Sequence, residues 1–112
     1  MKKNGVVEHY YDNGQLEEKG NYKNGKKDGV WKFYYDNGQL GIKETWKNGK
    51  LDGVWEGYHK NGQLEFKGTY KDGKKEGIWE EYNWNGSLQS RITYKDDNIK
   101  EKEQIISIKE NS

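Results

Sequence analysis

Hydrophobic residues alternate with polar ones over short segments, and this pattern repeats every 24 residues, as Gly5 and Gly29 illustrate. Alternation with a period of two predicts β-strands whose apolar side chains share one face of a sheet. Self-similarity at a fixed interval predicts a repeat protein. We therefore divide the chain into four units and a C-terminal tail or cap: 5–28, 29–52, 53–76, 77–100 and 101–112.

Each unit contains two strand-like segments that flank an Asn-Gly pair. Asn-Gly between hydrophobic runs is a strong hairpin signal, because a type I′ turn needs a positive φ at both central residues. A type I′ turn at 61–62 would place Trp55 opposite Gly68 and Tyr58 opposite Glu65. The second, polar turn of each unit is expected to be longer. The predicted fold is all-β, a single elongated, twisted antiparallel sheet formed as a meander of about eight strands.

This register predicts cross-strand charge pairs. Opposite charges that face each other stabilise a sheet, whereas like charges destabilise it. The second unit breaks the rule, because Lys32 would face Lys43. In the other three units a glutamate faces a basic residue, in the pairs Glu8–Lys19, Glu56–Lys67 and Glu80–Arg91.

The predicted sheet has one face rich in rings. A tryptophan opposite a glycine can lay its ring over the bare backbone, as we expect for Trp55 and Gly68. Glu44 and Ile92 stand where this glycine would be in their units. The expected core is a stripe of Trp, Tyr and Leu on this face. The other face carries a row of Val and Ile and a row of Tyr, namely Val6, Val30, Val54, Ile78, Tyr10, Tyr34, Tyr58 and Tyr82.

Composition supports an unusual core. Of the 112 residues, 29% are hydrophobic and 35% are charged, yet 14% are aromatic. So many rings argue against disorder, since aromatic side chains contribute the largest burial energies. The length fits a single domain, 1–112. A net charge of +1 predicts no bulk attraction to nucleic acid or membranes. The first residues contain no apolar run typical of a signal peptide, so we expect a cytoplasmic protein.

Catalytic and metal-binding residues are hard to find in this sequence. His9 and His59 occupy different positions in their units and match no zinc-binding spacing. The carboxylates recur as strand pairs and turn residues, and the serines lie far from either histidine. We therefore expect no enzyme activity, no metal and no cofactor.

The segment 53–64, Gly-Val-Trp-Glu-Gly-Tyr-His-Lys-Asn-Gly-Gln-Leu, resembles the bacterial variant of the MORN repeat. In particular, the units are similar to those of small proteins classed as antitoxins of toxin–antitoxin systems. The resemblance covers about 5–100. It implies an elongated twisted sheet used for binding, and a partner that is a toxin. Val7 in place of the first tryptophan and Asp97 in place of a turn glycine depart from the pattern.

These observations predict a non-enzymatic protein-binding module, an antitoxin-like protein or an inhibitor that occludes a toxin or a host or defence enzyme. An apolar row rimmed by charge is typical of protein contact sites. The predicted contact residues are Tyr10, Tyr34, Tyr58, Tyr82, Val30, Val54, Glu56 and Lys67.

The alternative is a membrane-surface or scaffold protein that binds anionic lipid or nucleic acid through its turns. The candidate residues for this contact are Lys26, Lys27, Lys50, Lys74 and Lys75.

The two ends of the sheet raise a further possibility. The β-branched segment 104–109 is predicted to be a capping strand that pairs with the last hairpin. The strand at 6–11 remains exposed, and pairing between such edges would give a homodimer.

Overall fold

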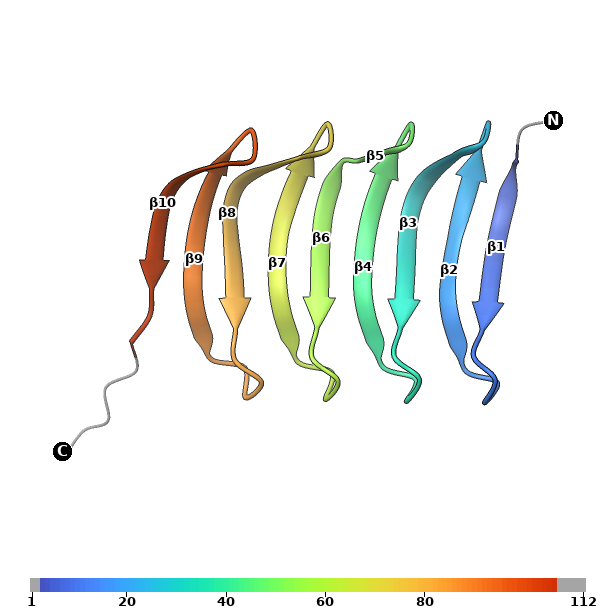
Figure 1. Ribbon diagram of the computed structural model, residues 1–112, viewed down its shortest axis with the longest axis horizontal. Helices are drawn as coiled ribbons and strands as arrows, with labels where there is room; N and C mark the ends of the chain where they lie inside the picture. The colour runs from blue at the N-terminus through green and yellow to red at the C-terminus, as the bar shows by residue number, and fades with distance from the viewer. Residues whose placement is uncertain (1–2, 107–112) are drawn as a thin grey trace.

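Within residues 3–106, which the computed structural model describes, the strands lie side by side in one antiparallel sheet in the order of the sequence (Figure 1). β5 and β6 both pair with β4, and β1 and β10 form the two edges. The ten strands are β1 (Gly5–Tyr10), β2 (Leu16–Lys23), β3 (Lys26–Tyr34), β4 (Leu40–Lys47), β5 (Lys50–Leu51), β6 (Gly53–Tyr58), β7 (Leu64–Lys71), β8 (Lys74–Tyr82), β9 (Leu88–Lys95) and β10 (Asn98–Gln104).

The molecule is a single layer. Its extents are 63 × 37 × 13 Å, and its radius of gyration is 16.8 Å. A compact domain of this length would have a radius of gyration of about 13 Å. The thinnest dimension leaves room for one sheet and its side chains, so both faces meet solvent. Among the described residues there is no helix long and apolar enough to cross a bilayer.

The predicted architecture, a single antiparallel meander built from four repeats, is confirmed. The strand number differs from the prediction for two reasons. Asp52 interrupts the strand between β5 and β6, and β10 adds a strand beyond the fourth unit. The capping strand is present at 98–104 instead of 104–109, because the turn at 96–97 continues the hairpin pattern directly. Residues 107–109 of the predicted cap lie outside the described residues.

The Asn-Gly turns are wider than predicted. In the third unit the amide of Gly62 donates to the carbonyl oxygen of His59 at 2.9 Å. Gly62 has a φ of 92°, whereas Asn61 is not left-handed. This is a three-residue loop with a glycine bulge, and the predicted type I′ turn is wrong. Next to this loop Tyr58 therefore lies opposite Leu64 instead of Glu65. A second irregularity between Gly57 and Tyr58 restores the predicted pairs in the rest of the hairpin.

Type I′ turns occur at the opposite ends of the strands. Asn24 and Gly25 both have a positive φ, of 54° and 81°. Lys23 and Lys26 pair directly on either side of them. These two-residue turns are therefore tight, and the prediction of a longer connection is wrong. Asp96 and Asp97 adopt the same conformation, with φ of 50° and 70°, so the missing glycine at 97 does not change the turn.

Glycines 20 and 68 are each covered by the tryptophan of the following unit. A Cβ atom added to Gly20 would lie 2.0 Å from the Trp31 ring, and one added to Gly68 would lie 2.0 Å from the Trp79 ring. The predicted stacking of Trp55 on Gly68 is wrong, although the two residues are opposite in register. A bulge leaves each glycine out of its pairing with the next strand, which brings the ring of that strand over it.

The second unit uses a different arrangement, because Glu44 replaces the glycine. Trp55 lies instead over Gly57 of its own strand, where an added Cβ would be 3.2 Å from the ring. The Glu44 carboxylate accepts hydrogen bonds from Nε1 of Trp46 at 2.9 Å and Nε1 of Trp55 at 3.2 Å. In the fourth unit Ile92 is tolerated because β10 brings no tryptophan against it.

Successive units are joined through their turns. Where the Asn-Gly loops stack, each Asn donates from its side chain to a carbonyl oxygen of the next loop: Asn13 to Asp36 (2.9 Å), Asn37 to Lys60 (3.2 Å) and Asn61 to Trp84 (2.9 Å). Where the tight turns stack, a turn amide donates to a carbonyl oxygen of the preceding unit, as Gly73 does to Leu51 at 2.7 Å. Each unit is therefore held by its neighbours.

Candidate binding face

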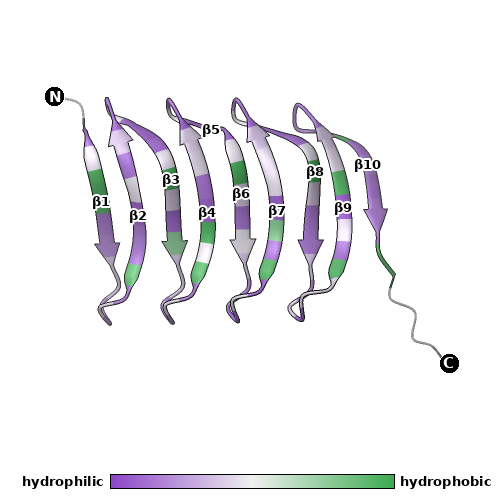
Figure 2. Cartoon of the chain, turned by 180° about the vertical axis from the view of Figure 1, so that it is seen from behind, coloured by the Kyte–Doolittle hydropathy of each residue, from purple (hydrophilic) through white to green (hydrophobic). Residues whose placement is uncertain are grey.

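The sheet exposes aliphatic side chains at the same level of every second strand on one face, which we call the Val/Tyr face. Their partners on the strands between are polar: Asn21, Thr45 and Thr69. The Val/Tyr face carries the two rows predicted from the sequence, and Figure 2 shows hydrophobic bands recurring on β1, β3, β6 and β8. Leu16 and Leu64 also lie on this face, opposite Tyr10 and Tyr58, so the prediction that the leucines lie with the tryptophans is wrong. The aliphatic side chains remain open to solvent, with exposed fractions of 69% for Val6, 46% for Val30, 45% for Val54 and 59% for Ile78. Tyr10 is also exposed, at 57%, whereas Tyr34, Tyr58 and Tyr82 are half-buried.

Three of the four tyrosines on this face are held by a glutamate two residues earlier. Their hydroxyls donate to Glu8, Glu56 and Glu80 at 3.1, 3.0 and 2.8 Å. The hydrogen bond to Glu80 and burial raise the pKa of Tyr82. The hydrogen bonds from Tyr82 and from Arg91 lower the pKa of the Glu80 carboxyl. In the second unit a lysine, Lys32, stands in place of this glutamate.

A single row of charged residues crosses the whole Val/Tyr face, and we call it the charge ladder. Each member is the cross-strand partner of the next, because the register continues from unit to unit. Glu8 and Lys19 lie 3.4 Å apart, and Glu80 and Arg91 lie 3.1 Å apart. In order from β1 to β10 the ladder is Glu8, Lys19, Lys32, Lys43, Glu56, Lys67, Glu80, Arg91 and Glu103.

The predicted anion-binding lysines fall into two groups. The ammonium of Lys27 lies 4.6 Å from the Trp31 ring centroid and 4.8 Å from that of Trp46. Lys75 is placed in the same way, 4.9 Å from the centroid of Trp79. These two lysines cover the rings through cation–π contacts. Lys26, Lys50 and Lys74 are instead exposed beside the tight turns.

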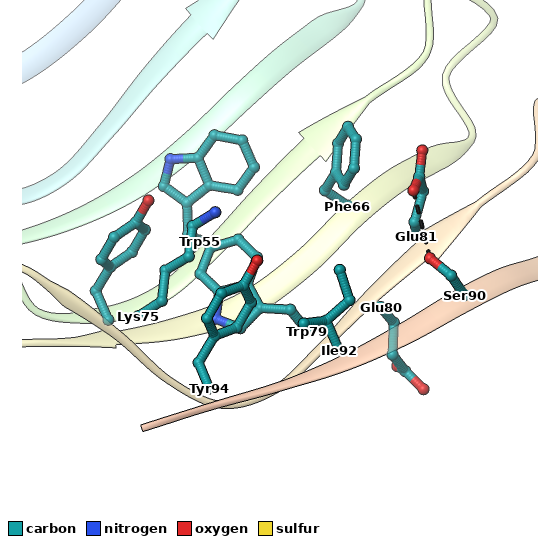
Figure 3. Close-up of a pocket in the computed structure, with 10 residues that line it drawn as sticks. Trp55, Phe66, Lys75, Trp79, Glu80, Glu81, Ser90, Ile92 and Tyr94 are labelled. Atoms are coloured by element: carbon teal, nitrogen blue, oxygen red, sulfur yellow. Dashed lines mark hydrogen bonds between the residues drawn. The ribbon is translucent and has the colours of Figure 1, made fainter. Parts of the chain in front are cut away.

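The opposite face, which we call the Trp face, packs its rings against one another. Trp31 is only 1% exposed and Trp79 is 7% exposed. A hollow of about 220 Å³ lies between Trp55, Phe66, Trp79 and Tyr94 (Figure 3). Its polar end is formed by Ser90, whose hydroxyl donates to Glu81 at 3.4 Å.

The two histidines have structural contacts. Nδ1 of His9 lies 2.7 Å from the Glu18 carboxylate. Nε2 of His59 donates to the carbonyl oxygen of Tyr82 in the next unit at 2.9 Å. At the equivalent position of the first two units, the hydroxyls of Tyr11 and Tyr35 donate to a carbonyl oxygen of the next unit in the same way. Across residues 3–106 the structure brings together no group of three or more His, Asp or Glu side chains able to hold a metal ion.

The repeat is recognised by the model of a known family, the MORN repeat variant, at residues 3–24, 27–48, 51–72 and 75–96. The chain belongs to the MORN repeat variant family. The resemblance noted in the sequence is therefore confirmed at the level of the family. The matched stretches keep the 24-residue interval and begin two residues before the units defined above.

Other comparisons add little to this assignment. None of the curated proteins matches the chain. Among solved structures, the MORN sheet is similar to a chain in the crystal structure of accessory secretory protein 1, 2 and 3 in Streptococcus pneumoniae, with a TM-score of 0.47 and 18% sequence identity. That match covers 86% of this chain and 18% of the other. The resemblance to antitoxins has no counterpart in these comparisons.

Sequence reasoning identified the Val/Tyr face but not the charge ladder. The pairs within each hairpin were predicted, including Lys32 opposite Lys43. The pairing of Lys19 with Lys32 joins two units, and it depends on the tight turn between β2 and β3, which is shorter than predicted. The sequence signal for the ladder is that charged residues recur every 24 residues at two positions of the unit. They are Glu8, Lys32, Glu56 and Glu80 at one position and Lys19, Lys43, Lys67 and Arg91 at the other.

Proposed function

We propose that this MORN protein is a non-enzymatic protein-binding module that docks its Val/Tyr face on another protein. The observation that supports the proposal is the row of exposed aliphatic side chains, from Val6 at 69% to Val54 at 45% exposure. Exposed apolar side chains gathered on one face and bordered by charge mark interaction sites on soluble proteins, and tyrosine is enriched in interfaces. Among residues 3–106 the Trp face offers no equivalent row of exposed aliphatic side chains, and Lys27 and Lys75 cover the rings of Trp31 and Trp79.

The test is capture of a stoichiometric protein partner from the cells of origin. The variant Val30→Glu with Val54→Glu should abolish capture, because both side chains lie in the centre of the exposed row. The matched variant Val30→Thr with Val54→Thr keeps the β-branched shape and should weaken capture less. Equal capture by the Glu variant and the original protein would overturn the proposal.

The narrower form of the proposal is an antitoxin-like inhibitor. It adds the claim that docking covers the working surface of a toxin or a host or defence enzyme. Nine strands side by side span about 40 Å, which gives the face the area to cover such a site. Assaying the captured partner with and without this protein distinguishes occlusion from tethering, since a tethered partner keeps its activity.

The second candidate is binding of an anionic surface through the tight turns. Its support is the pairing of lysines across these turns: Lys23 with Lys26, Lys47 with Lys50 and Lys71 with Lys74. Binding to phosphatidylserine vesicles that falls with added salt, and with Lys26→Glu plus Lys74→Glu, would favour this candidate.

A further inference from the structure

The charge ladder contains one interruption, at the second unit. Elsewhere acidic and basic residues alternate from strand to strand. Lys19, Lys32 and Lys43 instead follow one another across β2, β3 and β4 with no acidic residue between them. Directly opposite side chains have Cβ atoms about 5 Å apart, so like charges here repel. The fold does not require a lysine at 32, because the equivalent residues of the other units are Glu8, Glu56 and Glu80.

Lys32 and Lys43 also lack a partner carboxylate among the described residues. Lys19 lies 3.4 Å from Glu8, but no carboxylate oxygen of residues 3–106 is within 4.0 Å of the Lys32 or Lys43 ammonium. The Glu56 carboxylate, across from Lys43, accepts the hydrogen bond of Tyr58. Two adjacent ammonium groups therefore stand on an exposed face without neutralisation.

These lysines line a hollow in that face. The hollow has a volume of about 480 Å³, and its apolar wall is formed by Val6, Leu16, Val30 and Tyr34. Within residues 3–106 no carboxylate holds the Tyr34 hydroxyl as Glu8, Glu56 and Glu80 hold the other three, because Lys32 replaces that acid. The hollow therefore combines paired positive charge with apolar surface and an available hydroxyl.

We propose that this hollow receives an acidic side chain of the partner protein, an Asp or Glu that projects beside an apolar residue. The proposal rests on the proposed function and names the chemistry of the partner surface. The partner carboxylate restores between Lys32 and Lys43 the alternation that the chain itself lacks. The apolar neighbour packs against Val30 and Leu16. Residues that break a local rule of the fold are expected at functional sites.

The surroundings favour a protein over a phosphate polymer or a membrane. Glu8 lies on one side of the lysines in the ladder and Glu56 lies on the other. Nucleic acid and anionic bilayers present extended negative charge that would meet these glutamates, whereas a single carboxylate would not. The apolar wall likewise suits a folded protein surface rather than a phosphate backbone.

The test uses a random peptide library displayed on phage and selected on the full chain. Enriched peptides should carry Asp or Glu next to an apolar residue, and replacing that acid by its amide should weaken binding about tenfold or more. Lys32→Glu with Lys43→Glu should remove the binding. Lys47→Glu with Lys71→Glu makes the same change in net charge at the tight turns and should leave it intact. Thermal unfolding of each variant confirms that it is folded.

Three outcomes would contradict the inference. Enriched peptides without acidic residues, lost with Val30→Glu and Val54→Glu, would overturn it while the proposed function stands. Peptide binding unaffected by any variant of the face would overturn both. Tighter binding of phosphatidylserine vesicles or single-stranded DNA, lost with Lys32→Glu and Lys43→Glu, would assign the hollow to a phosphate-bearing surface instead.

Discussion

The junction between the second and third units differs from the junctions on either side of it. At the outer junctions a tryptophan ring lies flat over a glycine, as Trp79 does over Gly68. At the middle junction Glu44 replaces the glycine and binds the indole nitrogens of Trp46 and Trp55. One repeat position can therefore join units by apolar contact or by hydrogen bonds. The comparison shows that a regular backbone does not need a regular core.

The largest expected difference concerns the tryptophans themselves. Trp79→Ala should destabilise the fold by about 4 kcal/mol, because it removes a nearly buried ring and uncovers Gly68. Trp55→Ala should cost about half as much, since that ring is only half-buried. Urea unfolding of the two variants measures both values. Equal losses would show that the two kinds of junction are energetically alike.

Adding a methyl group to each glycine is the next test. Gly68→Ala should cost about 3 kcal/mol, because its Cβ would lie 2.0 Å from the Trp79 ring and the ring must move. Gly57→Ala should cost about 1 kcal/mol, since its nearest contact would be 3.2 Å. Thermal unfolding of both variants checks the order. A cost at position 57 as large as that at position 68 would contradict the described ring positions.

A double-mutant cycle converts the middle junction into the outer kind. Glu44→Gly alone should cost about 1–2 kcal/mol, because two indole N–H groups lose their acceptor. Gly57→Phe alone should cost about 3 kcal/mol, because the Trp55 ring occupies that space. Together they reproduce the Gly20 and Phe33 pattern, and the combined loss should be about 1–2 kcal/mol less than the sum. Strict additivity would mean that the two replacements are unrelated.

The same second unit is irregular on the Val/Tyr face, where a smaller effect of opposite sign is expected. Lys32→Glu should stabilise the fold by about 0.5 kcal/mol, because it gives Lys19 and Lys43 an acidic neighbour. Chemical denaturation at low and high salt measures this gain, which should shrink as salt is added. A stability loss would show that Lys32 has a partner within the fold. Stabilisation together with loss of peptide binding would separate folding from recognition.

The smallest expected effect is on the dependence of stability on acid pH. It concerns Glu80, in the part of the charge ladder where acidic and basic residues alternate, in contrast to the second unit. The pKa of Glu80 is lowered in the folded state by Tyr82 and Arg91. Its contribution is present above the pKa of the unfolded chain and is lost as the pH falls through the folded pKa. Glu80→Gln should therefore flatten the loss of stability on acidification. An unchanged acid profile would mean that the pair adds no measurable stability.

Much of this fold could be predicted because the repeat carries the information four times. The interval gave the units, alternation gave the two faces, and cross-strand charges such as Glu56 and Lys67 gave the register within a hairpin. The turn types and the contacts between units were missed. Both turns of a unit can contain Asn-Gly, and the wider loop is held locally, by the hydrogen bond that the Gln63 amide donates to Oδ1 of Asn61. The stacking of Trp79 on Gly68 requires a β-bulge, and no local sequence pattern predicts that bulge.

The candidate face was predictable to the same extent. The exposed rows follow from alternation alone, and the mismatch of Lys32 with Lys43 was visible in the sequence. The cation–π contacts of Lys27 could not be predicted, because a lysine near a turn is ordinarily solvated. Only the register brings its ammonium group close to the rings of Trp31 and Trp46. Chemistry within one unit could be anticipated, whereas chemistry created by stacking could not.

The hydrogen bonds between successive turns also determine how such a protein can change size in evolution. Asn37 reaches the next loop, and Gly49 reaches back to the preceding turn, so a duplicated unit would find the same contacts at both of its ends. Each duplication would lengthen the sheet by two strands, about 10 Å. It would also change the distance between the irregular second unit and one edge. The number of duplicated units would thus set the distance between two points at which the sheet contacts a partner.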